Sequence, residues 1–299
     1  MIPNPIKFLA KPEYLLRPRQ VLRRLARIWQ PTPTQATVRL PWGAVVQVHT
    51  GDAVGSAIYY YGIFDKIVPE AIWRLSDQGE TDVDAGANIG QNSSLMWSRV
   101  GCAGRVIAFE PHPEIFTELQ SNRDRSRNPD TAQVQLENVA LGETAGEAWL
   151  DEGEYFYRNR GTATLSPEAR GGKGIKVKVR TLDEFLENIK QVGVCKIDVE
   201  GHELGVLRGA ANTLKRRGIR DIVFEDFNPK PSPVTLLLVQ HGFTLFELHE
   251  TWLKPLLVPL NVARSASRPG FLFNYLATLD PARAVARFRS AGWHCLLNL

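Results

Sequence analysis

The chain has 299 residues, and its 36 Lys and Arg against 32 Asp and Glu give a formal net charge of +4. Its 43% of hydrophobic and 23% of charged residues are typical of a soluble globular protein with one well-buried domain of about 200–250 residues plus extensions. No run approaches the roughly 20 apolar residues of a membrane span, and no signal-peptide pattern is present, so we expect a cytoplasmic protein.

Residues 1–35 are predicted to form a basic helical extension and linker. The first 30 residues carry seven Lys and Arg against Glu13 alone. The apolar residues at 21, 22, 25, 28 and 29 share one helical face, which favours packing on the main domain, with contact to an anionic membrane surface or a protein partner as the alternative. Because the basic residues gather in this leader rather than around a groove, we expect no nucleic-acid partner.

Residues 36–280 are predicted to form one α/β domain. A hairpin at 36–48 and a helix at 65–77 precede strands that alternate with amphipathic helices. The predicted strands are 81–84, 105–110, 134–138, 194–198 and 221–225, and the predicted helices are 91–100, 113–122, 182–190 and 203–217. Such alternation indicates a Rossmann-like fold, with a mostly parallel central sheet and helices on both faces.

Two further regions accompany this core. A hairpin-like insert at 146–151 and a loop at 153–174 follow the third strand, and the loop is either a lid over the acceptor or a surface loop. A helix at 234–241 and strands at 244–248 and 271–277 follow the fifth strand. Residues 281–299 are predicted to form a C-terminal helix and tail, with the helix at 281–290.

Polar side chains end all five core strands. They are Asp84, Glu110, Asn138, Asp198 and Glu225. The carboxyl ends of parallel strands meet at the crevice where open α/β sheets bind ligands, and desolvated carboxylates are costly unless paired. The pattern therefore predicts a ligand crevice.

The stretch 82–90 predicts a nucleotide-binding loop. Gly86 and Gly90 permit a sharp turn into the next helix, and Glu110, twenty residues later, can accept both hydroxyls of a ribose. A dinucleotide fingerprint would have glycine where Asp84 stands, and a carboxylate would repel a pyrophosphate. The loop therefore favours the cationic S-adenosylmethionine, with a nicotinamide-dependent oxidoreductase as the alternative.

Several motifs resemble those of the FkbM-type class I methyltransferases. They are Val83-Asp84-Ala85-Gly86-Ala87-Asn88-Ile89-Gly90, Ile107-Ala108-Phe109-Glu110-Pro111, Asn138-Val139-Ala140-Leu141-Gly142, Arg180-Thr181-Leu182-Asp183, Lys196-Ile197-Asp198-Val199-Glu200-Gly201-His202-Glu203 and Leu207-Arg208-Gly209-Ala210. The resemblance covers roughly residues 37–225. It implies an enzyme that transfers a methyl group from S-adenosylmethionine, typically to a hydroxyl, here of a sugar or another small-molecule or glycan acceptor.

The resemblance also implies roles for single residues, all within the cofactor-binding crevice. Asp84, Gly86, Asn88 and Gly90 would hold the methionine end of the cofactor, Glu110 and Pro111 the ribose, and Asn138 and Val139 the adenine. Asp198 would face the methyl group and the acceptor.

The run from Asp198 to Glu203 is the predicted catalytic segment, because crowded titratable groups shift one another's pKa. We expect Asp198 or His202 to act as the base and Glu200 to position the acceptor or cofactor, whereas Glu203 caps the next helix.

Two alternatives stay open for this segment. Asp198, Glu200, Glu225 and Asp226 could instead hold Mg²⁺, which we do not favour because they serve cofactor and acceptor without a metal. The chain could also be a non-catalytic cofactor-binding partner protein.

Overall fold

The computed structural model describes residues 33–126, 132–154, 156–169, 174–260 and 273–297. The predicted basic helix in residues 1–30 lies outside the described residues, so its role stays a prediction. The described chain begins with an antiparallel hairpin, β1 (Gln35–Arg39) and β2 (Val45–His49), where the sequence predicts one.

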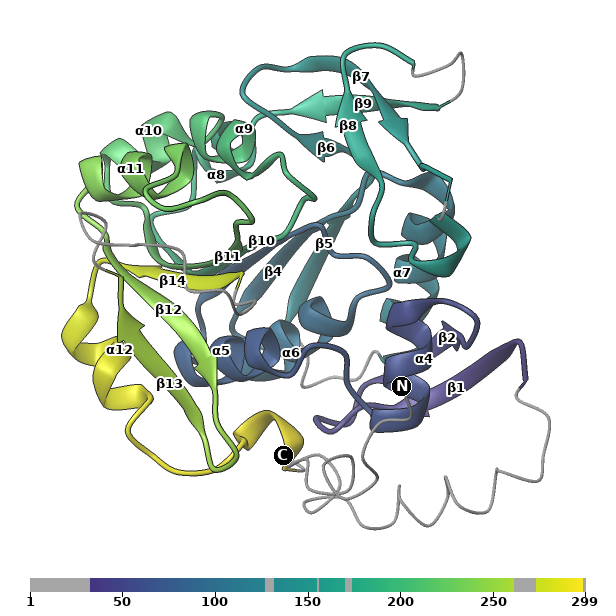
Figure 1. The fold of residues 1–299 in the computed structure, drawn as a ribbon, viewed down its shortest axis with the longest axis horizontal. Helices are drawn as coiled ribbons and strands as arrows, with labels where there is room; N and C mark the ends of the chain where they lie inside the picture. Colours follow the sequence, from purple (N-terminus) through teal and green to yellow (C-terminus); the bar gives the residue numbers. More distant parts are fainter. Residues whose placement is uncertain (1–32, 127–131, 155, 170–173, 261–272, 298–299) are drawn as a thin grey trace.

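A central sheet of eight strands organises the described chain (Figure 1). Its order is β13 (Pro255–Pro259), β12 (Thr244–Glu250), β14 (Asn274–Thr278), β11 (Ile219–Glu225), β10 (Val192–Ile197), β3 (Thr81–Ala85), β4 (Arg105–Phe109), β5 (Gln133–Glu137). The five strands from β11 to β5 are parallel neighbours, whereas β14 runs antiparallel to both β11 and β12. The predicted mostly parallel α/β fold is therefore confirmed.

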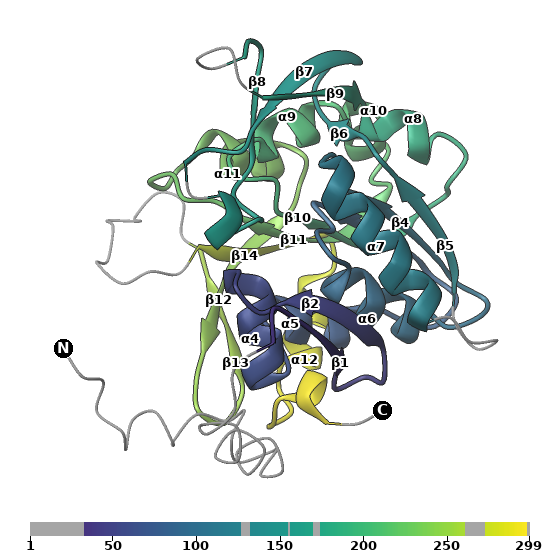
Figure 2. The same ribbon diagram turned by 90° about the vertical axis from the view of Figure 1, so that its right-hand side faces the viewer.

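Helices cover both faces of this sheet, and each face has its own apolar core (Figures 1 and 2). The helices are α4 (Ala53–Tyr61), α5 (Ile67–Leu75), α6 (Gln91–Val100), α7 (Pro113–Ser126), α8 (Leu182–Leu186), α9 (Glu203–Arg208), α10 (Ala211–Lys215), α11 (Pro233–Gln240) and α12 (Pro281–Arg287). Along β10, Val194 joins the core under α5 and α6, and its neighbour Cys195 joins the core under α8 to α10. Such continuous burial explains why this strand is apolar at nearly every position.

The structure corrects two predicted elements and adds a sheet. The predicted helix at 203–217 is two helices, α9 and α10; at the break the carbonyl oxygen of Gly209 accepts a hydrogen bond from the Asp183 N–H, and the Asp183 carboxylate accepts from the N–H groups of Asn212 and Thr213 in the first turn of α10. The predicted loop at 153–174 includes a short helix, Phe156–Arg158, and strand β8 (Thr164–Ser166). With β6 (Ala140–Leu141), β7 (Gly146–Asp151) and β9 (Ile175–Arg180), β8 forms a second sheet in the order β6-β9-β7-β8, which the sequence did not predict.

The described part of the predicted C-terminal tail packs on α5. Arg74 is buried, and its guanidinium lies 2.7 Å from Glu70 while it donates hydrogen bonds to the carbonyl oxygens of Arg287, Ser290 and Gly292. This network anchors α12 and the residues after it to the main core. Within the described residues, no helix has the length and apolar character needed to cross a membrane.

Candidate active site

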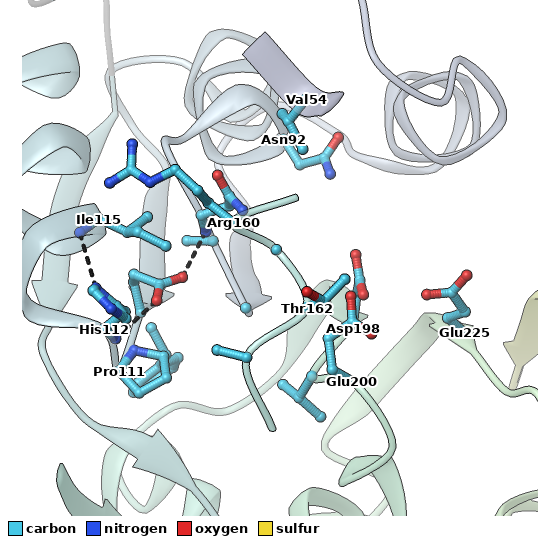
Figure 3. Close-up of a pocket in the computed structure, with 18 of the residues that line it drawn as sticks. Val54, Asn92, Pro111, His112, Ile115, Arg160, Thr162, Asp198, Glu200 and Glu225 are labelled. Atoms are coloured by element: carbon cyan, nitrogen blue, oxygen red, sulfur yellow. Dashed lines mark hydrogen bonds between the residues drawn. The ribbon is translucent and has the colours of Figure 1, made fainter. Parts of the chain in front are cut away.

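A cavity of about 350 Å³ lies at the carboxyl ends of the central strands, as the sequence predicts (Figure 3). Its size falls within the range of about 300–1,000 Å³ that is usual for small-molecule sites. Pro111 and His112 line one end, whereas Asp198, Glu200 and Glu225 line the other. We call these the cofactor end and the acceptor end.

The loop after β3 forms one wall of the cavity, and glycine is required in it. Gly86 has φ +79, and a Cβ there would lie 1.8 Å from the carbonyl oxygen of Asp198. Only glycine therefore lets this loop pass so close to the end of β10. Gly90 has φ +93 and begins α6, while Asn88 has φ +50 and lines the cavity.

Glu110 lines the cofactor end and joins the two loops around it. Its two carboxylate oxygens accept hydrogen bonds from the backbone N–H groups of Asn88 and His112, each at 2.9 Å. Each oxygen retains a second lone pair that could accept a hydrogen bond from a hydroxyl group. Burial raises the pKa of Glu110 to about 7, although both N–H groups and Lys196 oppose this rise.

Asn138 and Val139 follow β5 but have different positions. The Asn138 side-chain amide donates to the carbonyl oxygens of Glu110 and Pro111, at 2.8 and 3.0 Å. It therefore holds the loop after β4 in place and is not part of the cavity wall. Val139 and Pro111 line the cavity directly, with Ile115 beside them, and offer an apolar surface for a flat ring.

Asp84 is fully buried within β3, outside the cavity wall. Its carboxylate accepts a hydrogen bond of 2.6 Å from the Ser93 hydroxyl and lies 3.2 Å from the ammonium of Lys196. The same ammonium donates to the carbonyl oxygen of Gly86 at 2.6 Å and lies 3.4 Å from Asp198. Burial disfavours its charge, but Asp198 and Asp84 outweigh burial and raise the pKa of Lys196. Lys196 thus links Asp84 in β3, the loop after β3 and the acceptor end of the cavity.

Carboxyl groups gather at the acceptor end. Burial, together with Asp198 and Glu203, raises the pKa of Glu200 to about 7. Burial raises the pKa of Glu225 to about 8, with Asp198 and Glu200 as further causes. Asp65, before α5, also lines this end, where desolvation and Glu250 raise its pKa to about 6. Such crowding is typical of functional sites.

Other acidic and basic residues of the predicted catalytic segment lie away from the cavity. The His202 ring lies close against Gly205, outside the cavity wall, and burial lowers its pKa although Glu143 opposes this. Glu203 is buried and accepts hydrogen bonds from the N–H groups of Val199 and Gly201, in the turn before α9.

The structure places Asp226, one residue of the alternative Mg²⁺ site, away from the cavity. The Asp226 carboxylate accepts a hydrogen bond of 2.5 Å from Ser232 and lies 3.0 Å from the ammonium of Lys230. It is thus engaged away from the cavity. Among the described residues, no group of three or more His, Cys, Asp and Glu is arranged to hold a metal ion.

The loop between β7 and β8, for which the sequence left a lid and a surface loop open, lines the cavity. Arg160 lines the cavity and pairs with Glu118 of α7 at 2.8 Å. A Cβ at Gly161 would lie 3.4 Å from the Asn88 amide and 4.0 Å from the Glu200 carboxylate, so the loop passes over both ends of the cavity. The ring of the buried Phe156 stacks on the His112 ring and anchors the first part of this loop.

Sequence reasoning missed Lys196 and Asp65 as residues of this site, and it placed Arg160 only within the candidate lid. The signal for Lys196 was a charged residue within a strand that is otherwise apolar. Asp65 carried a weaker signal, since it only begins a predicted helix, and Arg160 lay in a loop rich in Gly and Arg with no local clue to its partner.

The sequence pattern that defines the methyltransferase FkbM domain matches residues 84–251, which is more than half of the chain and includes both ends of the cavity. The chain belongs to the FkbM methyltransferase family. Membership of this family implies S-adenosylmethionine as the cofactor, which favours it over the nicotinamide alternative.

Relatives of this FkbM-family chain include two named methyltransferases. Hexuronic acid methyltransferase AglP of Haloferax volcanii is 32% identical over 164 residues, which cover 49% of this chain and 63% of that protein. Methyltransferase 1 of Beauveria bassiana is 30% identical over 148 residues, which cover 42% of this chain and 57% of that protein. The chain thus spans less than two thirds of the length of either relative.

The chain is also similar to a solved structure of an S-adenosylmethionine-dependent O-methyltransferase from Thermotoga maritima. The two are 14% identical, with 85% of this chain and 80% of that chain covered and a TM-score of 0.42.

The residues of the FkbM-family cavity fit S-adenosylmethionine. Glu110 retains acceptor capacity for a ribose, and Val139 and Ile115 offer an apolar surface for an adenine. The carboxylate of Asp198 suits the positive charge of a sulfonium group. The donor set therefore agrees with the cofactor that the family implies.

Proposed function

We propose that the protein transfers a methyl group from S-adenosylmethionine to a hydroxyl of a sugar or a similar small hydroxylated acceptor. The observation that carries this proposal is the position of Asp198. Its carboxyl lines the cavity at the end of β10, and 41% of its side chain is exposed. It lies between the cofactor loop, which touches its backbone, and the other carboxyl groups of the acceptor end.

Methylation of a hydroxyl releases a proton, and this end of the cavity can receive it. When bound, S-adenosylmethionine supplies an electrophilic methyl group. Asp198 accepts the hydroxyl proton, while the Lys196 ammonium, 3.4 Å away, orients its carboxylate. Glu200 accepts a hydrogen bond from a neighbouring hydroxyl and positions the acceptor. His202 has no part in this proposal, because its ring lies outside the cavity wall.

Holding the acceptor in line is the larger contribution to rate, worth about 7–11 kcal/mol in well-oriented reactions. Proton transfer to a positioned carboxylate adds roughly 10²–10⁴-fold. The lid loop supports positioning, since Gly161 lies beside both Asn88 and Glu200.

A transfer assay with S-adenosylmethionine and a panel of hexosides and hexuronosides tests the proposal. We expect formation of S-adenosylhomocysteine and of a methyl ether that resists alkaline hydrolysis. A base-labile methyl ester would instead show methylation of a carboxylate, and the hydroxyl assignment would be wrong.

A substitution at Asp198 tests its proposed role as the base. We expect Asp198→Asn to lower kcat about 10²–10⁴-fold, because the acceptor proton then has no carboxylate to receive it. Its affinity for S-adenosylhomocysteine, measured by calorimetry, should stay within a few-fold. Asp124→Asn, which changes an exposed carboxylate on α7, is the matched control and should keep full activity. Equal kcat in the two variants would remove Asp198 from the proposal, and no turnover at all in the unmodified chain would favour the non-catalytic alternative.

Two further proposals concern the whole chain. Residues 1–30 are proposed to pack on the main domain, with contact to an anionic membrane surface or a protein partner as the alternative, and the chain is proposed to be cytoplasmic. Binding to anionic vesicles by the full chain, compared with a variant that lacks residues 1–30, separates the two readings of this segment. Tighter vesicle binding by the full chain would contradict packing on the main domain and favour the membrane alternative.

A further inference from the structure

Two exposed phenylalanines stand at the acceptor end of the cavity and have no part in the steps above. Phe64 is 38% exposed and Phe227 is 52% exposed, and both line the cavity. Among the large exposed apolar side chains of the described residues, these two also belong to the cavity wall. Ligand pockets are lined mainly by apolar and aromatic side chains, so two exposed rings in a cavity wall offer a surface for a ligand.

The two rings come from separate elements that carry the acidic groups. Phe64 directly precedes Asp65, and Phe227 lies two residues after Glu225 at the end of β11. The Asn274 amide donates to the Asp65 carboxylate at 3.1 Å and so ties the first segment to β14 beside β11. The Phe227 ring packs on Phe273 with a centroid distance of 4.5 Å. Both rings therefore line the same end of the cavity as the carboxyl groups of Asp65 and Glu225.

The charges at this end would disfavour an acidic acceptor. The Lys and Arg side chains of the cavity wall are Lys196 and Arg160, and each is already paired, with Asp84 and Asp198 in one case and Glu118 in the other. A carboxylate on the acceptor would therefore approach Asp65 and the strand-end carboxyl groups without a cationic partner among the described wall residues. Asp65, whose pKa of about 6 leaves it mostly ionised at neutral pH, would repel that carboxylate, and desolvating an unpaired charge beside a like charge is costly.

We propose that Phe64 and Phe227 bind the apolar face of the acceptor and that Asp65 excludes acidic acceptors, so that the site takes a neutral sugar and rejects a uronate. This inference rests on the proposed function. A pyranose suits such a site, because its C–H face packs on an aromatic ring while its hydroxyls donate to carboxylates. The hexuronic acid named for the Haloferax volcanii relative is thus the acceptor class that this chain disfavours.

The test uses two probes that differ in one group, methyl β-glucopyranoside and methyl β-glucopyranosiduronate. Each is titrated into the full chain loaded with S-adenosylhomocysteine, and its Kd is measured by saturation-transfer difference NMR. We expect the glucoside to bind at least about 10-fold more tightly than the uronate. Asp65→Asn, which keeps an acceptor for Asn274, should narrow that ratio several-fold by improving uronate binding.

Ring variants test the aromatic surface. We expect Phe64→Ala and Phe227→Ala each to raise the glucoside Kd about 5-fold or more, whereas Phe64→Tyr and Phe227→Tyr keep the ring and retain binding. Leu236→Ala, which removes an exposed apolar side chain on α11 outside the cavity wall, is the matched control. Affinity for S-adenosylhomocysteine should stay within about two-fold throughout, since none of the changes touches the cofactor end.

Several outcomes would overturn the inference. They are uronate binding as tight as glucoside binding, no binding of either probe, and alanine variants that bind the glucoside normally. Loss of S-adenosylhomocysteine affinity in the alanine variants would also refute it, because the rings would then serve the cofactor. None of these results decides the proposed function, which fails separately if Asp198→Asn leaves methyl transfer unchanged.

Discussion

Replacing Lys196 by methionine would expose how far the site depends on one buried cation. Methionine keeps the length of the side chain but removes the ammonium that lies 3.2 Å from Asp84 and donates to the carbonyl oxygen of Gly86 at 2.6 Å. Asp84 is fully buried, so its carboxylate would lose its nearest cation in a place that water does not reach. We therefore expect Lys196→Met to destabilise the folded protein strongly.

The magnitude follows from the burial of both partners. Lys196 is 2% exposed and Asp84 is 0% exposed. Breaking such a buried pair from one side costs about 3–5 kcal/mol, a large share of the roughly 5–15 kcal/mol by which domains are stable. Adding Asp84→Asn removes the unpaired charge and keeps an acceptor for the Ser93 hydroxyl, so the double variant should recover about 2 kcal/mol or more of the loss.

Urea unfolding followed by circular dichroism measures these free energies in the wild-type chain, both single variants and the double variant. Lys176→Met is the matched control, because Lys176 pairs with Glu147 at 2.6 Å on the surface, with both side chains more than half exposed. We expect it to change the free energy of unfolding by less than about 1 kcal/mol. If Lys196→Met behaves like this control, or if the losses of the two site variants simply add, the coupling argued from the buried pair is wrong.

Three further predictions concern the cofactor loop and the core. Glu110→Ala should weaken binding of S-adenosylhomocysteine about 10-fold or more by calorimetry, since hydrogen bonds to a charged group contribute about 1.5–3 kcal/mol, and unchanged affinity would contradict the cofactor assignment. Gly86→Ala should cost more than about 2 kcal/mol of stability through its contact with Asp198, whereas Gly43→Ala, at φ +92 with nothing within 4 Å, should cost only about 1–2 kcal/mol, and equal losses would refute the close approach. Burial raises the pKa of Asp82 from an ordinary 3.8 to about 7, so the folded protein retains a proton that the unfolded chain has lost, and its free energy of unfolding falls as pH rises across that window. Urea unfolding at successive pH values measures this fall in the free energy of unfolding. Asp82→Asn should make the fall smaller by an amount on the order of 4 kcal/mol, and an unchanged pH profile would contradict the prediction.

Local pattern was sufficient to predict the five parallel strands of the central sheet and the position of the cavity, but not β13. Alternating apolar strands and amphipathic helices indicate parallel crossovers without knowledge of any tertiary contact. Asp198 and Glu225 ended predicted strands, and both line the cavity. The glycines of the turn were also identified from the sequence. Glycine is required at position 86, however, because the Asp198 backbone passes close to it, and not only because a ligand would.

The remaining features depend on contacts between residues far apart in sequence. Asp84 also ends a predicted strand, but its side chain points beneath the loop to Lys196, 112 residues later. The helix predicted at 203–217 is interrupted where Asp183, more than 25 residues earlier, hydrogen-bonds to Gly209 and to the first turn of α10, a contact that helical periodicity does not reveal. His202 lies in the same short run as Asp198, yet the turn before α9 directs its ring away from the cavity. Sequence order alone could not separate these side chains.

The place of β14 in the sheet has a consequence for how the chain folds. This strand is the last of the sheet in sequence, but it lies between β11 and β12. Until residues 274–278 have been synthesised, β12 and β13 have no hydrogen-bonded neighbour joining them to the rest of the sheet, and β11 presents an open edge. An open apolar edge is a site of aggregation, and long-range pairing of this kind is slow. We therefore expect chains halted before Asn274 to aggregate, and the complete sheet to form only after synthesis of β14.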